Sequence, residues 1–225
     1  MLTLGIDDAG RGPLIGPMTL AGALLTTTQE KFLASQNVND SKLLTHSTRI
    51  KLAKIIKENS EAHHIVTVQP NDIDFALNTK TNLNTLEAIH TAEIINRLNA
   101  GKFLEKRIKV IVDCPSVNTA AWKKTLSQYI SHSSNLTIYC EHKADANHIS
   151  VAAGSILAKV TREDEVAKLK KKYGNIGSGY PSDPTTKQFL KSHGRSLSEA
   201  GIFRKTWSTW KKLYPEKQQA TLEGF

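Results

Sequence analysis

The fold is first indicated by the stretch LTLGIDDAGRGP, which occupies residues 2–13. Leu2, Leu4 and Ile6 alternate with small or polar residues, and this period-two pattern is typical of a β-strand. The strand ends at an acidic pair, Asp7 and Asp8, and a glycine-rich turn follows. Residues 18–25 are again mostly apolar, so we predict a second, buried strand that forms a hairpin with the first.

Beyond the hairpin, predicted strands and helices alternate along the chain. We expect strands at residues 63–68, 110–112 and 136–140, and helices starting near Thr45 or Ser47 and at residues 84–98, 120–130, 149–172, 185–192 and 207–213. This order indicates an α/β domain built around a mixed sheet. The end of the chain resembles a small helical appendage, so we predict a main domain at residues 1–180 and a C-terminal helical region with a tail at residues 181–225.

The chain is basic. Its 225 residues include 30 lysines and arginines against 21 aspartates and glutamates, a formal charge of +9. Such an excess favours polyanions, of which nucleic acid is the commonest large one, although a merely basic protein is the alternative. No apolar run approaches the roughly 18 residues of a membrane helix, and acids stand where a signal peptide would begin. We therefore expect a cytoplasmic protein that does not associate with membranes.

Carboxylates stand at three predicted strand ends or helix starts. Asp7 and Asp8 end the first strand, Asp113 follows residues 110–112, and Asp145 precedes the longest helix. Grouped carboxylates repel each other unless a cation lies between them, and oxygen-rich sites suit Mg²⁺ or Mn²⁺. Two such ions can activate a water and stabilise the leaving oxygen in phosphodiester cleavage. The alternative is that each acid only ends a strand or caps a helix.

The turn Gly10-Arg11-Gly12 follows the first acidic pair directly. Glycines allow positive φ and a close approach of the backbone, so amide groups can point at a phosphate. Arg11 adds a charge suited to the same ligand. A plain hairpin turn is the alternative.

These residues also carry a resemblance to a known family. GIDDAGRGP (5–13) is similar to the opening motif of type 2 ribonucleases H (ribonuclease HII). The same holds for DSK (40–42), HKAD (142–145), AGSILAKVTR (153–162) and GSGYPSDP (177–184). The blocks lie in family order from Gly5 to about Trp207, and the later ones are closest to archaeal members.

The resemblance implies a ribonuclease H-like mixed sheet flanked by helices, with a small C-terminal helical region that contributes to substrate binding. It implies a monomeric endonuclease that hydrolyses the RNA strand of RNA–DNA hybrids and nicks duplex DNA 5′ of embedded ribonucleotides. Two Mg²⁺ or Mn²⁺ ions would serve in catalysis, and the product would carry a 5′-phosphate and a free 3′-hydroxyl.

The resemblance also implies roles for individual residues. The metal-binding and catalytic residues would be Asp7, Asp8, Asp113 and Asp145. Gly10, Arg11 and Gly12 would bind the nucleic-acid backbone at the ribonucleotide–DNA junction, and Lys42 would contact a phosphate. Tyr180 would pack against the junction sugar and sense the 2′-hydroxyl, the group that distinguishes RNA from DNA.

The chain departs from the family pattern at three positions. Asp8 replaces the usual Glu, Gly154 replaces a small Ala or Ser, and Glu163 replaces Asp. None of these changes removes an acid, so we interpret them as adjustments of the site that leave its function in place. Two other functions stay open: a nuclease of the same fold that acts on branched DNA, and a hybrid-binding protein without catalysis, of which Asp8 would be a sign.

The tail carries one further pattern. Gln219, Leu222 and Phe225 follow each other at intervals of three, like the start of a peptide that binds a sliding clamp. Such peptides usually end in two adjacent aromatic residues, and this chain has one, so weak binding is expected. A frayed terminus is the alternative.

Overall fold

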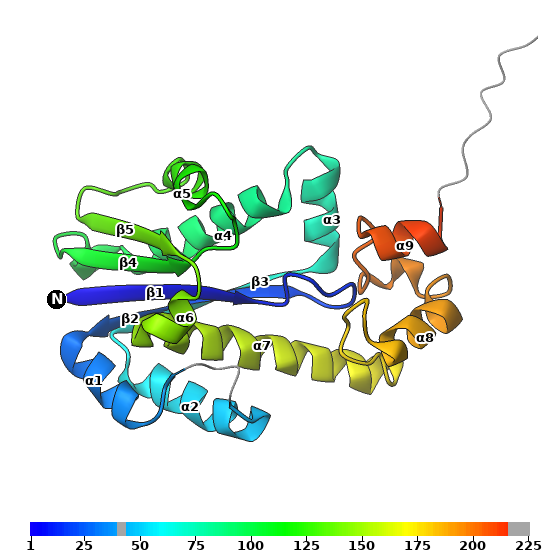
Figure 1. The fold of residues 1–225 in the computed structure, drawn as a ribbon, viewed down its shortest axis with the longest axis horizontal. Helices are drawn as coiled ribbons and strands as arrows, with labels where there is room; N and C mark the ends of the chain where they lie inside the picture. Colours follow the sequence, from blue (N-terminus) through cyan, green and yellow to red (C-terminus); the bar gives the residue numbers. More distant parts are fainter. Residues whose placement is uncertain (40–43, 216–225) are drawn as a thin grey trace, which may run out of the picture.

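The computed structural model describes residues 1–39 and 44–215, and its centre is a five-stranded mixed sheet (Figure 1). Its strands, in the spatial order β3-β2-β1-β4-β5, are β1 (Leu2–Ala9), β2 (Met18–Thr26), β3 (Ala62–Val68), β4 (Ile108–Asp113) and β5 (Leu136–Glu141). β1, β2 and β3 pair antiparallel, whereas β1, β4 and β5 run parallel. The predicted mixed sheet and its opening hairpin are confirmed.

Helices cover both faces of the sheet (Figure 1). One face is covered by α3 (Pro70–Asn78), α4 (Leu83–Leu98) and α5 (Thr119–Ser127), and the other by α1 (Thr27–Ser35), α2 (His46–Asn59), α6 (Ala144–Asn147) and α7 (Ile149–Tyr173). A 3₁₀ turn, η2 (Gly101–Phe103), leads into β4. The C-terminal elements α8 (Pro184–His193), η3 (Ser198–Ala200) and α9 (Ser208–Leu213) lie beyond the far end of α7.

Two glycines bring α7 close to the sheet. A Cβ on Gly5 would lie 2.1 Å from the carbonyl carbon of Ser150, and one on Gly154 would lie 2.8 Å from the carbonyl oxygen of Ala21. The absence of a side chain therefore permits this packing. Gly154 lowers helix propensity by about 1 kcal/mol relative to alanine, and the close helix–sheet contact gives this departure a physical reason.

The predicted helices and strands are present, with ends that move by a few residues. The largest shift is at α5, which stops at Ser127 rather than at residue 130. Sequence analysis missed α1, α3 and α6. α1 follows β2 without a break and buries only Leu33, so its apolar pattern is weak, although Thr26 and Gln29 form a capping box at its start. α6 has only four residues, too few to show a period.

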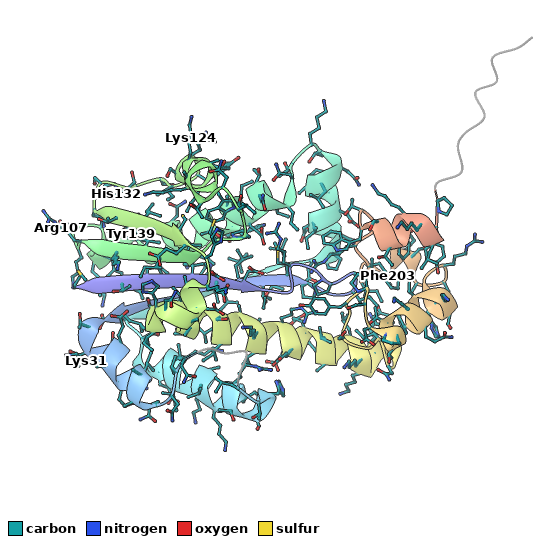
Figure 2. All side chains as sticks on the ribbon, viewed as in Figure 1. Lys31, Arg107, Lys124, His132, Tyr139 and Phe203 are labelled. Carbon is teal, nitrogen blue, oxygen red and sulfur yellow. The ribbon has the colours of Figure 1, made fainter. Side chains whose placement is uncertain are left out.

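The C-terminal elements share an apolar cluster with the first hairpin. Its buried members are Leu14, Ile15, Val166, Ile176, Phe189, Leu190, Ile202, Phe203 and Trp210. Phe203 forms a β-bridge with Ile15, and Figure 2 shows it between the hairpin turn and the C-terminal helices. The C-terminal region therefore packs directly behind the glycine-rich turn. The division into residues 1–180 and 181–225 stays a prediction.

Among the described residues, no helix combines the length and apolar character needed to cross a membrane.

Candidate active site

Three carboxylates meet at one edge of the sheet. The parallel pairing of β1 with β4 ends at Ile6 and Val112, so Asp7 and Asp113 follow on neighbouring strands at the same edge. Asp145 comes from α6, which begins after Lys143 in a left-handed conformation (φ 57°). One oxygen from each of Asp7, Asp113 and Asp145 lies within 4.8 Å of the others. The structure thus brings together three of the four acids singled out in the sequence.

Backbone amides hold two of these carboxylates in place. Asp113 Oδ1 accepts a hydrogen bond from the Ala144 amide (3.0 Å), and Asp7 Oδ1 accepts one from the Asp8 amide (2.7 Å). Ser155 of α7 also hydrogen-bonds the Asp7 side chain. Asp7 is 7% exposed and Asp145 only 2%. Asp7 and Asp113 are therefore held in position, and Asp7 and Asp145 are largely removed from water.

The buried cluster needs positive charge. Burial, and then the negative charge of Asp8, raise the pKa of Asp7 from 3.8 to about 7. Oxygen ligands at this spacing match the preference of hard divalent cations, which offset the repulsion between carboxylates. The donor set therefore fits a divalent metal of the Mg²⁺ or Mn²⁺ kind.

Asp8 is placed differently from the other three acids. Successive strand residues point to opposite faces, so Asp8 is on the α4 side of β1, away from Asp7. It is not part of the three-carboxylate group, although it lines the same open pocket. Burial raises its pKa to about 6, although the nearby Arg11 guanidinium opposes this shift. The structure thus places Asp8 between the acid cluster and Arg11.

Arg11 has a buried partner that the sequence analysis missed. Its guanidinium lies 2.9 Å from Glu87 Oε2 and donates to Asn84 Oδ1 at 2.8 Å, both on α4. Burial and the negative charge of Asp8 raise the pKa of Glu87 to about 8. The Arg11 side chain is therefore engaged with α4, and the turn offers mainly its backbone to a ligand.

The glycine-rich turn faces a second turn that carries Tyr180. Gly10 has a φ of 84°, and a Cβ there would lie 2.2 Å from Arg162 Nε, so a side chain has no room. A Cβ on Gly12 would lie 3.5 Å from Tyr180 Cε1. The Gly179 carbonyl accepts from the amides of residues 14 and 15 at 2.8 and 3.2 Å. The two turns are thus joined through their backbones.

Tyr180 projects from a loop whose backbone is held by hydrogen bonds to Asp183. Its side chain is exposed, and the Arg162 guanidinium lies 5.4 Å from the ring centroid. Asp183 accepts from the amides of Ser178 (2.6 Å) and Thr185 (2.9 Å), and these bonds lower the pKa of Asp183 to about 2. The backbone that carries the tyrosine ring is therefore held in place.

The acids and both turns line one open pocket of about 460 Å³. Further lining residues, to which sequence analysis assigned no role, are Arg49, Lys159, Arg162 and Glu163. Lys159 Nζ donates to Ser155 Oγ at 2.9 Å, which links it to Asp7. Ser155, Lys159 and Arg162 recur at spacings of four and three, which places them on one side of α7, and this signal could have revealed them.

The remaining singled-out residues divide into two groups. Glu163, a departure from the family pattern, forms ion pairs with Arg49 and His46 beside the pocket. Lys42 and the tail residues Gln219, Leu222 and Phe225 lie outside the described residues.

Comparison with known proteins gives one consistent result. The family model described as ribonuclease HII matches residues 4–210. The ribonuclease HII of Thermococcus sibiricus is 38% identical over 229 residues, covering 98% of this chain and 96% of that protein. The crystal structure of ribonuclease H2 from Pyrococcus horikoshii superposes with a TM-score of 0.84 at 36% identity, over 95% of this chain and 97% of that one. The structure of the PCNA:RNase HII complex from Archaeoglobus fulgidus gives a TM-score of 0.79 at 33% identity, with full coverage of both chains.

Proposed function

Because this chain belongs to the ribonuclease HII family, it is an endonuclease for RNA–DNA hybrids, and we propose that Asp7, Asp113 and Asp145 hold its divalent metal ions. The observation that carries this proposal is the convergence of three carboxylates within 4.8 Å, of which Asp7 and Asp145 are buried. The ribonuclease H-like fold predicted from the resemblance is confirmed by the Pyrococcus structure. The two alternatives, a branched-DNA nuclease and a hybrid-binding protein without catalysis, are not favoured by this membership.

We propose that two ions, Mg²⁺ or Mn²⁺, serve in the reaction. Bound divalent metal supplies an activated water and stabilises the leaving 3′ oxygen in phosphodiester cleavage. The chain's own groups keep the ligands in position: Ser155 and the Asp8 amide orient Asp7, and the Ala144 amide orients Asp113. Asp8 is proposed as the fourth acid, acting from the α4 side of β1.

We propose that the two facing turns recognise the substrate. Gly10, Arg11 and Gly12 would hold the backbone at the ribonucleotide–DNA junction, and Tyr180 would pack on the sugar that carries the 2′-hydroxyl. The contact between Gly12 and the Tyr180 ring, both beside the acids, supports this division of roles. Lys42 is proposed as a phosphate contact. The enzyme would then also nick duplex DNA 5′ of a single embedded ribonucleotide and leave a 5′-phosphate.

One assay tests the whole proposal. A DNA duplex with one ribonucleotide is incubated with and without Mg²⁺ or Mn²⁺, and the products are mapped at nucleotide resolution. We expect a metal-dependent nick 5′ of the ribonucleotide. Cleavage of branched all-DNA structures alone would contradict the proposal, and so would tight binding of the duplex without cleavage in either metal.

We propose a sliding clamp as a partner, bound through Gln219, Leu222 and Phe225. The similarity to a ribonuclease HII whose structure is a complex with PCNA supports this idea, as does the spacing of the three residues. Deletion of residues 218–225 should abolish clamp binding measured by calorimetry and leave cleavage of a short duplex intact. Equal clamp affinity with and without these residues would exclude the tail as the contact. Because the family acts on nucleic acid, we also propose that the enzyme works in the cytoplasm, and we propose that it is a monomer.

A further inference from the structure

Arg204 has no exposed surface, yet its partners are all backbone carbonyls. Its Nη2 donates to the Gly10 oxygen (2.6 Å) and the Gly16 oxygen (3.0 Å). Nη1 donates to the Arg11 oxygen (2.7 Å), and Nε donates to Gly16 as well (3.2 Å). Within residues 1–39 and 44–215, no carboxylate lies within ion-pair distance of it. A buried guanidinium is costly unless its donors are satisfied, so this one is committed to the glycine-rich turn.

These bonds fix the direction of two amide groups. In a planar trans peptide the C=O and the following N–H point in opposite directions. The carbonyls of Gly10 and Arg11 point at Arg204, so the N–H groups of Arg11 and Gly12 point away from it. Arg204 lies on the buried side of the turn and does not line the pocket, whereas Gly10, Arg11 and Gly12 do. The two N–H groups are therefore directed to the open side, where a phosphate oxygen could accept from both.

The neighbours of Arg204 extend the same arrangement. Trp207 Nε1 donates to the third carbonyl of the turn, that of Gly12, at 3.0 Å, and its ring lies 4.9 Å from the Arg204 guanidinium. Asp74 of α3 accepts from the amides of residues 205 (2.6 Å) and 206 (3.0 Å). The segment that carries Arg204 and Trp207 is thus anchored to α3, on one side of the sheet, and itself anchors the turn.

We propose that Arg204 is a positioning residue for strand recognition, which holds the turn 10–12 so that the amides of Arg11 and Gly12 bind one substrate phosphate. This proposal rests on the substrate-binding role proposed above for the turn. Trp207 assists by fixing the Gly12 carbonyl. A turn held in its binding conformation before the substrate arrives loses less entropy on binding, so affinity should depend on Arg204 although it does not touch the substrate.

The test compares an unmodified DNA duplex that contains a single ribonucleotide with the same duplex carrying one uncharged methylphosphonate linkage. To choose that linkage, each phosphate near the ribonucleotide is replaced in turn, and the replacement that slows the parent enzyme most is used. Arg204→Lys keeps the charge but lacks the planar guanidinium, so it cannot reproduce the four hydrogen bonds to the three carbonyls. Trp207→Phe keeps the ring over Arg204 and removes only the donor to Gly12. Arg195→Lys, at an exposed arginine of the C-terminal region, is the matched control.

On the unmodified duplex we expect Arg204→Lys to lower kcat/KM about 10-fold or more, mainly through KM, and Trp207→Phe about 3-fold, because hydrogen bonds to charged groups are the stronger ones. On the methylphosphonate duplex both variants should equal the parent, because the contact they perturb is already lost. Arg195→Lys should behave as the parent on both duplexes.

Other outcomes overturn the proposal in distinguishable ways. Equal losses on both duplexes would show that Arg204 acts on general stability and not through a phosphate. Unchanged kcat/KM of both variants on the unmodified duplex would also refute it. If no methylphosphonate slows the parent, the substrate-binding role of the turn fails, and this inference fails with it. If Arg204→Lys does not fold, Trp207→Phe alone decides, by the same comparison of the two duplexes.

Discussion

The pocket has two parts that are built in different ways. Its floor consists of Asp7, Asp113 and Asp145 at the edge of the sheet, and its rim consists of the turns 10–12 and 177–183. The floor is fixed by strand register and by burial under α7. The rim contains no regular strand or helix, and single side chains such as Arg204 and Asp183 hold it by bonds to the backbone. The comparison indicates that the acidic floor and the proposed substrate-binding rim are held in place by separate means.

Substitutions in the floor of the pocket should have the largest effect on cleavage. Asp145→Asn keeps the shape of the side chain and removes its charge, so we expect cleavage to fall roughly 1,000-fold or more because metal-held transition-state charge is lost. Binding of the hybrid should survive, because phosphate contacts elsewhere supply most of the affinity. Single-turnover cleavage and fluorescence anisotropy measure the two quantities. Asp7→Asn should behave alike, and near-parental turnover in either variant would remove that acid from the catalytic set.

Substitutions in the rim should affect the selectivity for substrates that carry a 2′-hydroxyl. Tyr180→Ala should lower activity at a single embedded ribonucleotide about 10- to 100-fold, in the range found for base or sugar stacking on an aromatic ring, and should damage discrimination for the 2′-hydroxyl. Tyr129 is also 40% exposed and lies away from the pocket, so Tyr129→Ala is the matched control. The measurement is the ratio of cleavage rates at a ribonucleotide and in a long hybrid. A parental rate for Tyr180→Ala at the single ribonucleotide would exclude this loop as the ribose sensor.

Asp8 lies between floor and rim, and its substitution should have a smaller effect. Mg²⁺ requires closer octahedral geometry than Mn²⁺, so Asp8→Glu, which adds one methylene, should raise activity in Mg²⁺ about 3-fold and change it little in Mn²⁺. Steady-state rates in each metal measure this. The same rate change in both metals, or none, would show that the backbone has already compensated for the shorter side chain.

The buried charge of the floor should also appear as a pH effect in the metal-free protein. The folded state raises the pKa of Asp7 from 3.8 to about 7, so it binds the proton more tightly than the unfolded chain does. This contribution to stability is complete below pH 3.8 and is lost as the pH rises to about 7. This rise in the pKa corresponds to about 4 kcal/mol, and each kcal/mol shifts the Tm of a chain of this size by about 2–4 °C, so we expect Tm to fall by roughly 10 °C over that interval.

Scanning calorimetry at several pH values tests this expectation. Asp7→Asn is the control, because it lacks the titrating group, and its Tm should lack this component of the decline. Added Mg²⁺ should restore the Tm of the parent protein at pH 7. An identical pH profile for parent and variant would show that Asp7 does not titrate in this range.

Local sequence determined most of the elements and indicated the candidate site residues. The alternation of Leu2, Leu4 and Ile6 predicted β1, and the apolar residues 110–112 predicted the strand that delivers Asp113. Both signals are local, because a strand or a helix is recognised by its own period. The acids and the glycine-rich turn are adjacent to these elements in the chain, so they were found with them. The three missed helices are short, or bury few residues, and so lack a clear period.

Only the tertiary structure decided how these parts meet. Strand register placed Asp7 beside Asp113, and the α4 face of β1 separated Asp8 from them. No local pattern could have indicated that Arg204 returns across 194 positions to hold Gly10, or that Glu87 would take the Arg11 side chain. Such contacts join residues that are far apart in the sequence, so they form only when the chain folds and leave no local pattern. The sequence therefore indicated the candidate reactive groups, and the fold specified which groups hold them in place.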